Sequence, residues 1–235
     1  AYDAKTGDQV WRFYITPSHI PEENDTPALK MAAETWSGDT LATVGGGGHA
    51  WNEMTYDPVS NQLFFGTSGN ARYAYDDRSP GGGDNLFLSS IVAINAETGE
   101  YNWHYQTVDK DSWDFNATMN IILADLDIDG KKRETALIAP KNGFHYAVDR
   151  HTGELLTAGK FAKVNWATHI NLETGRPNYD PEAEYWDIED GETMLFWPNF
   201  WGSHTWSAMA FHPGLALTYI PVVDLPSEVD NEGTG

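Results

Sequence analysis

The sequence predicts an all-β protein built from the four-stranded antiparallel blades of a β-propeller. Three observations lead to this prediction. A turn motif recurs along the chain, short apolar strands occur in groups of four, and the periodicity typical of helices is weak throughout. We expect residues 1–235 to form one partial propeller domain, with two full blades and part-blades on either side.

The recurring motif reads A-x-[DN]-A-x-T-G-x-x-x-W. It occurs as AYDAKTGDQVW at 1–11 and AINAETGEYNW at 93–103, and in the diverged form AVDRHTGELLT at 147–157. In each copy the acid or amide is expected to cap a tight turn through backbone N–H groups, and the glycine to take a positive φ. The tryptophan is then expected to pack against the neighbouring sheet.

Two complete units of four strands can be written along the chain. The predicted strands are 50–58, 61–69, 89–96 and 99–107 in the first unit, and 117–127, 134–141, 143–150 and 153–161 in the second. A third unit begins with strands at 204–213 and 215–224, and the polar segment 158–200 is expected to cross the surface between blades. Because propellers typically contain 4–8 blades, we expect this stretch to be part of a longer ring.

The composition excludes several classes of partner and site. The net charge is −21, from 35 acidic and 14 basic residues, so nucleic acid and anionic membranes should be repelled. No apolar run approaches the length needed to span a bilayer. Cysteine is absent, which excludes a disulfide, a thiolate nucleophile and a covalently attached c-type haem within this stretch.

Unusual polar and aromatic residues fall at matching places in the predicted blades. The start of the first strand and the end of the second lie at the same rim of an antiparallel meander. Trp51, Asp114 and the pair Thr205–Trp206 precede or open first strands, whereas Asn70 and Lys141 follow second strands. An aromatic ring, a carboxylate, an amide and an ammonium group are therefore expected to converge near the propeller axis.

Three other motifs favour structural interpretations. The glycine run 45–48 lacks the Gly-Lys-Ser/Thr of a phosphate loop and does not open a helix. The stretch DLDIDG at 125–130 resembles the start of a calcium loop, but Ala136 stands where that loop needs Glu, so a hairpin turn is favoured. The acidic cluster within 182–190 could supply glycosidase carboxylates, although a solvated face suits a highly acidic protein better.

Several stretches together closely resemble the PQQ-dependent (quinoprotein) alcohol dehydrogenases. They are GGGGHAW, YDPVSNQLFFGTSGN, RSPGGGDNLFLSSIVAINAETGEYNWHYQT, DSWDF and APKNGFHYAVDR. The resemblance implies a periplasmic enzyme with an eight-bladed propeller, pyrroloquinoline quinone (PQQ) on the axis, and a bound Ca²⁺ or, in some members, a lanthanide. It also implies a small alcohol as substrate and a cytochrome c or a quinone as electron acceptor.

The same resemblance implies cofactor-binding roles for three residues. Trp51 resembles the ring that forms the floor under PQQ, with the preceding glycines allowing close approach. Lys141 resembles the cation that hydrogen-bonds the reducible quinone oxygens, and a lysine here favours general alcohol dehydrogenases over the methanol-oxidising members, which tend to carry arginine. Trp206 matches a further cofactor contact, although Thr205 replaces the asparagine that often precedes it.

The resemblance also implies a metal site and a general base. Asn70 resembles a side-chain oxygen ligand of the metal. Asp114 resembles the base that removes the alcohol proton, and it lies beside the metal as a ligand. Asn116 stands where lanthanide enzymes place a second aspartate, and its neutral amide favours Ca²⁺ over a trivalent ion.

Two alternatives remain open at this point. The first is a non-enzymatic propeller scaffold, since tryptophan-docking repeats of this kind also occur in propellers without cofactor or catalysis. The second is a carbohydrate-active propeller, which depends on the acidic cluster within 182–190 alone.

Overall fold

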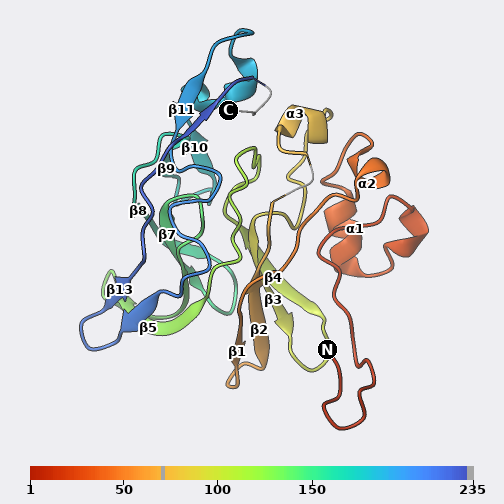
Figure 1. Cartoon of the computed structure of the whole chain (residues 1–235). Coiled ribbons are helices and arrows are strands. Elements are labelled where there is room, and N and C mark those ends of the chain that lie inside the picture. Colours follow the sequence, from red (N-terminus) through yellow and green to blue (C-terminus); the bar gives the residue numbers. More distant parts are fainter. Residues whose placement is uncertain (70–71, 232–235) are drawn as a thin grey trace.

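The computed structural model describes residues 1–69 and 72–231, and strands dominate it (Figure 1). The first four-stranded antiparallel sheet has the order β1 (Met54–Asp57), β2 (Gln62–Gly66), β3 (Ser90–Asn95) and β4 (Tyr101–Gln106). The second has the order β5 (Ile122–Ile128), β6 (Lys131–Ile138), β7 (Phe144–Asp149) and β8 (Leu155–Lys160). Each predicted unit therefore forms one sheet, and the predicted β-propeller class is confirmed.

The remaining strands form three two-stranded pairs. They are β9 (Ala167–Ile170) with β10 (Pro177–Tyr179), β11 (Met194–Phe196) with β14 (Ser227–Val229), and β12 (Ala210–His212) with β13 (Leu217–Tyr219). The pair β12–β13 falls inside the two strands predicted for the third unit. The turn between β5 and β6 contains Asp129 and Gly130, both with positive φ, so DLDIDG forms a hairpin as favoured from the sequence.

The segment 158–200, which was expected to cross the surface between blades, contains strands that the sequence did not predict. Strands β9 and β10 pair around the turn NLETG, which is a further copy of the Asn-x-x-Thr-Gly motif. The Asn171 side chain accepts hydrogen bonds from the N–H groups of Glu173 and Thr174 at 2.8 and 3.2 Å. The motif was present in the sequence, but polar residues around it obscured the short flanking strands.

Helices also occur where the sequence shows little helical periodicity. The α-helices are α1 (Pro27–Ala33), α2 (Thr40–Thr43) and α3 (Tyr75–Arg78), and the 3-10 turns are η1 (Pro21–Glu23), η2 (Pro181–Ala183) and η3 (Tyr185–Asp187). Helix α1 begins at a favourable N-cap, because the Thr26 hydroxyl accepts the N–H of Leu29 at 3.2 Å and Pro27 follows it. It is too short for its pattern to be distinguished from a turn.

The repeated motif forms the turn predicted for it. The side chains of Asp3, Asn95 and Asp149 each accept two backbone N–H groups from the next residues, at 2.8–3.1 Å. The glycines Gly99 and Gly153 have φ of 74° and 75°, a region that favours glycine.

Each tryptophan of the motif docks onto the turn of the next copy. The indole N–H of Trp11 donates to the carbonyl of Ala96 at 3.1 Å, and that of Trp103 donates to the carbonyl of Arg150 at 3.1 Å. A Cβ on Gly153 would lie 2.6 Å from the Trp103 ring, so only glycine leaves room for the indole. The motif therefore fixes the spacing of adjacent sheets as well as the turn.

The main core lies between the two four-stranded sheets, which stand side by side (Figure 1). It combines aromatic residues from both sheets and from the segments that follow them, including Phe64, Trp103, Phe115, Tyr146 and Trp166. A second core joins the first sheet to α1 through residues such as Ala32, Phe65 and Val92. The first sheet is therefore packed on both faces, which fixes the position of the loops at its ends.

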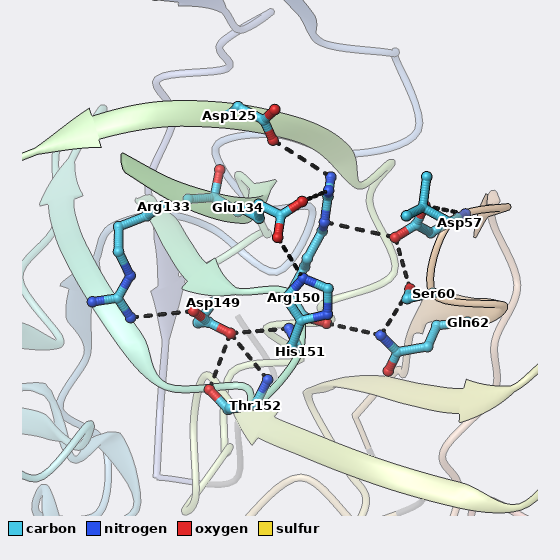
Figure 2. Close-up of polar contacts among 12 residues, drawn as sticks. Asp57, Ser60, Gln62, Asp125, Arg133, Glu134, Asp149, Arg150, His151 and Thr152 are labelled. Carbon is cyan, nitrogen blue, oxygen red and sulfur yellow. Dashed lines mark hydrogen bonds and ion pairs between the residues drawn. The ribbon is translucent and has the colours of Figure 1, made fainter. Parts of the chain in front are cut away.

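Arg150 joins the two sheets a second time, through its side chain (Figure 2). Its guanidinium pairs with Glu134 on β6, approaches Asp125 at 3.7 Å on β5, and reaches Asp57 of the first sheet at 3.6 Å. The Gln62 side chain donates to the Arg150 carbonyl at 3.2 Å. Both ends of this residue therefore hold the sheets together.

Asp57 is almost fully buried in this network, with 4% of its side chain exposed. Burial raises the pKa of Asp57, but hydrogen bonds from Ser60 and Val59 and the charge of Arg150 outweigh it, so the pKa lies below its ordinary 3.8. The stabilisation from ionised Asp57 is therefore present above pH 3.8 and is lost as the pH falls through the lowered pKa.

Replacing Gly66 with alanine should disrupt the contact between the sheets. A Cβ at this position, where β2 ends, would lie 1.6 Å from the carbonyl oxygen of Ala117. We expect Gly66→Ala to lower the free energy of unfolding by at least about 3 kcal/mol in urea titrations of the full-length protein. Gly159→Ala is the matched control, because nothing lies within 4 Å of its Cβ. Equal urea midpoints for the two variants would contradict the close approach of Gly66 to the Ala117 carbonyl.

Replacing Arg150 with methionine should leave buried Asp57 without its cation. We expect Arg150→Met to lower the free energy of unfolding by about 2 kcal/mol at pH 7. Arg133→Met is the control, because Arg133 pairs only within the second sheet, with Asp149 and the exposed Glu154. Arg133→Met should lower the free energy of unfolding by less than about 1 kcal/mol. A loss for Arg133→Met as large as that for Arg150→Met would argue against an inter-sheet role.

Candidate functional site

The candidate site lies where loops enter and leave the strands of the two sheets. Trp51 precedes β1, Asp114 lies in the loop between β4 and β5, and Lys141 follows β6. Hydrogen bonds link the three side chains: the Asn116 side chain bonds to both Trp51 and Asp114, and the Lys141 ammonium bonds directly to Asp114. The structure therefore brings together three of the five predicted site residues.

Both carboxylate oxygens of Asp114 accept hydrogen bonds. Oδ1 accepts from the Asn116 amide at 2.7 Å, and Oδ2 accepts from the Lys141 ammonium at 2.7 Å. The side chain remains 26% exposed, so one side of the carboxylate faces open space. The backbone of Asp114 has φ of 60°, a left-handed conformation that aspartate and asparagine tolerate better than most residues.

Lys141 is held in place by the segment 200–203. Its side chain is only 9% exposed, and its ammonium makes a second hydrogen bond, to the carbonyl of Phe200 at 2.9 Å. The N–H of Ser203 donates to the Lys141 carbonyl at 3.0 Å. Between them, Gly202 passes so close that a Cβ would lie 2.4 Å from the Lys141 Cβ. These contacts direct the ammonium toward Asp114.

Trp51 presents a partly exposed aromatic ring at the same place. Its exposed fraction is 42%, which is high for an indole, and its N–H donates to the Asn116 side-chain oxygen at 3.0 Å. The glycine run before it has positive φ at all four positions. Gly48 in particular lies against Ile15 and Thr16, where a Cβ would approach to 2.9 Å. The run therefore allows close backbone packing just before Trp51.

A buried carboxylate, Asp111, shapes the turn that carries Asp114. Its Oδ1 accepts the N–H groups of Trp113 and Phe115 at 3.1 and 3.0 Å, on either side of Asp114, and its Oδ2 accepts the Ser89 hydroxyl at 2.8 Å. Burial raises the pKa of Asp111, and the charge of Asp114 adds to this, against the hydrogen bond from Phe115.

Arg78 is almost fully buried and hydrogen-bonds to the turn that carries Asp114. Its guanidinium donates to the Asp111 carbonyl at 2.7 Å, to the Asn85 side chain at 2.8 Å, and to the carbonyls of Arg72 and Tyr73. Burial lowers the pKa of Arg78 to about 10, so it remains a cation at neutral pH. It thus ties the chain after position 71 to the turn that carries Asp114.

The other two predicted residues are Asn70 and Trp206. Asn70 lies outside the described residues, but Gly69 before it lies against both carboxylates, since a Cβ there would be 2.8 Å from Asp111 Oδ2 and 3.3 Å from Asp114 Oδ1. Trp206 is 60% exposed and packs edge-on against Trp201, with ring centroids 6.1 Å apart. Trp201 belongs to the segment 200–203 that holds Lys141.

Residues 1–168 match the protein family described as glucose/ethanol/alcohol dehydrogenase, β-propeller domain, of the PQQ type. The chain belongs to this family. Quinohemoprotein alcohol dehydrogenase ADH IIB of Pseudomonas putida is 48% identical over 233 residues, which is 99% of this chain and 33% of the relative. The chain thus spans about a third of the length of the curated relatives it matches.

Solved structures of family members show the same fold. Quinohemoprotein alcohol dehydrogenase ADH-IIG of Pseudomonas putida HK5 is 45% identical with a TM-score of 0.89, over 97% of this chain and 33% of that one. The enzyme from Comamonas testosteroni is 38% identical with a TM-score of 0.90, over 97% and 34%. A europium-containing methanol dehydrogenase is 32% identical with a TM-score of 0.81, over 94% and 39%.

The acidic cluster within 182–190 is mostly exposed. Glu182, Asp187, Glu189 and Asp190 are exposed, and Glu184 is half-buried. Burial raises the pKa of Glu184, and the charge of Asp187 adds to this. Across residues 1–69 and 72–231, no three His, Cys, Asp or Glu side chains are grouped as metal ligands. In the same ranges, no helix is long and apolar enough to cross a membrane.

Sequence reasoning missed the residues that support the cluster. Asn116 was considered only for its charge, while Asp111, Arg78 and the Phe200 carbonyl were not considered at all. Asp111 had a local signal, because an aspartate two and four residues before two turn N–H groups is typical of a side-chain-capped turn. The bond from Arg78 to Asp111 and that from Lys141 to the Phe200 carbonyl had no such signal, since the two residues of each pair are 33 and 59 positions apart.

The ion pair between Asp114 and Lys141 should be measurable as a coupling free energy. In a double-mutant cycle we use Asp114→Asn, which tolerates the left-handed backbone, and Lys141→Met, which keeps the apolar stem. We expect a coupling of about 1–3 kcal/mol in urea unfolding, because the bond is charge-assisted and partly buried. Strict additivity of the two changes would show that the pair is not formed in solution.

Proposed function

We propose that the protein containing this chain oxidises a small alcohol to an aldehyde with PQQ as its redox cofactor. The observation that carries the proposal is the cluster in which Asn116 links a half-exposed indole, Trp51, to the ion pair of Asp114 and Lys141. Membership of the PQQ dehydrogenase family supports it, as do relatives named alcohol dehydrogenases.

The residues present fit a planar anionic quinone. The Trp51 ring is 42% exposed and offers a flat surface for offset stacking. The Lys141 ammonium lies at the same place, and it is one of few cations in a chain with net charge −21. A positive group in an acidic chain is suited to holding and stabilising negative charge on a bound quinone.

For the metal, we propose Ca²⁺ beside Asp114, with Asn70 as a further oxygen ligand. Hard cations take carboxylate and amide oxygens, and the Asp114 carboxylate is partly exposed. Asn116 adds no charge, and its oxygen already accepts the Trp51 N–H, so the described residues offer less negative charge than a trivalent ion needs. The europium-containing relative makes lanthanides the direct comparison in an assay.

The proposed mechanism assigns a separate task to each side chain. When bound, PQQ would supply an electrophilic quinone carbonyl as acceptor for the hydride, or its equivalent, that leaves the alcohol carbon. Asp114 accepts the hydroxyl proton, and its position is fixed by hydrogen bonds to both carboxylate oxygens. The Lys141 ammonium would stabilise the negative charge that develops on the bound quinone as it is reduced. The flat face of the Trp51 ring would hold the bound cofactor in one orientation, which keeps the quinone and the alcohol in the geometry that the reaction needs.

The proposal also includes partners and a compartment. Electrons pass to a cytochrome c or a quinone, and relatives named quinohemoprotein or alcohol dehydrogenase (quinone) support an acceptor of this kind. The compartment is the periplasm, as the family resemblance implies. A non-enzymatic propeller scaffold remains the competing function, and it would need neither a base nor a cation at this rim.

The test uses the full-length protein that contains this chain, reconstituted with PQQ and CaCl₂. We expect bound-quinone absorbance and oxidation of primary alcohols with an artificial electron acceptor. Asp114→Asn should bind PQQ but lose at least about 100-fold in kcat, because the base is removed. Asp127→Asn, an exposed carboxylate on β5, should retain full activity. Absence of PQQ binding by the wild-type protein would instead support the scaffold.

A further inference from the structure

Asn116 contacts every member of the described cluster, and only 3% of it is exposed. Its side-chain oxygen accepts the Trp51 indole N–H at 3.0 Å. Its amide nitrogen donates to Asp114 twice, to Oδ1 at 2.7 Å and to the backbone carbonyl at 2.7 Å. Its own carbonyl accepts the backbone N–H of Lys141 at 3.2 Å. No other described residue is shown bonding to all three.

The chemistry of the partners fixes which way the amide points. An indole N–H can only donate, so the atom facing Trp51 must be the oxygen. A carboxylate and a carbonyl can only accept, so the atom facing Asp114 must be the nitrogen. The amide is therefore satisfied in one orientation and would lose all three of these hydrogen bonds in the other.

We propose that Asn116 is a positioning residue, which sets the orientation of the Trp51 ring and of the Asp114 carboxylate at the same time. The effect of Asn116 on turnover rests on the proposed function, whereas its effect on the orientation of Trp51 and Asp114 does not. Asp114 has a left-handed backbone, and the amide bridges its carbonyl and its carboxylate, which fixes χ1 relative to that backbone. Because the same amide holds the indole, the ring and the base cannot move independently.

Other side chains at this position would reproduce only part of the arrangement. Leucine matches the shape of asparagine but can neither accept from Trp51 nor donate to Asp114. Aspartate can still accept the indole N–H, but it turns a second anionic oxygen toward the Asp114 carboxylate. The two substitutions therefore separate the indole contact from the carboxylate contact.

The first experiment needs no cofactor. In the full-length apo protein labelled with [¹⁵N]tryptophan, the indole resonance of Trp51 is assigned by its loss in Trp51→Phe. We expect this resonance to shift in Asn116→Leu, which removes the acceptor, and to remain near its original position in Asn116→Asp. An unchanged Trp51 resonance in Asn116→Leu would overturn the inference, whether or not PQQ binds.

The second experiment measures the catalytic consequence with ethanol as substrate, after PQQ, Ca²⁺ and an artificial electron acceptor have been added. We expect kcat per bound PQQ to fall by about 10- to 100-fold in both Asn116→Leu and Asn116→Asp, because the base is displaced. The deuterium isotope effect with 1,1-dideuterated ethanol should increase, as the chemical step becomes slower. Loss of folded protein alone would lower total activity without changing either value.

Asn120→Leu is the matched control. Asn120 is a buried amide four residues further along. Its side-chain oxygen accepts the N–H of Met209 at 3.0 Å, and its side-chain nitrogen donates to the Met209 carbonyl at 3.2 Å. The change should reduce stability but leave kcat per bound PQQ and the isotope effect unchanged. If Asn116→Leu behaves as Asn120→Leu does in both measurements, Asn116 is structural and the inference is wrong.

Discussion

The structure depends on the docking of each motif tryptophan onto the turn glycine of the next copy. Trp103 shows the constraint most clearly, because its ring occupies the space that a Cβ on Gly153 would need, and its N–H satisfies the Arg150 carbonyl. A glycine alone can accept both the left-handed backbone and the contact with the ring. One local sequence motif therefore determines a long-range distance between sheets.

The site follows from that spacing. Once adjacent sheets are fixed, the loops before β1 and β5 and after β6 meet at one place, and side chains from separate blades come within hydrogen-bonding distance. Buried polar residues then hold the loops in position. Asp111 caps the turn around Asp114, and Arg78 joins that turn to the chain after position 71. A loop with satisfied buried polar groups can keep a strained residue such as Asp114 in one conformation.

Charge distribution gives this arrangement its chemical character. The chain is strongly acidic, yet a nearly buried ammonium, Lys141, is placed against the carboxylate of Asp114, which shares the neighbour Asn116 with the Trp51 indole. The acidic residues elsewhere are largely exposed, where they affect solubility more than chemistry. The proposed chemistry thus depends on a few partly buried groups, and the surface charge gives little information about it.

The sequence by itself determined the turn motif, the four-stranded units and the rim on which Trp51, Asp114 and Lys141 meet, because these depend on local turn chemistry and strand alternation. It did not reveal the hairpin β9–β10 or helix α1, whose patterns are too short to stand out. Only the tertiary structure revealed the hydrogen bond between Asn116 and Trp51, that between Arg78 and Asp111, and that between Lys141 and the Phe200 carbonyl. The two residues of each pair are distant in the chain, and such a hydrogen bond exists only once packing has brought its two atoms together.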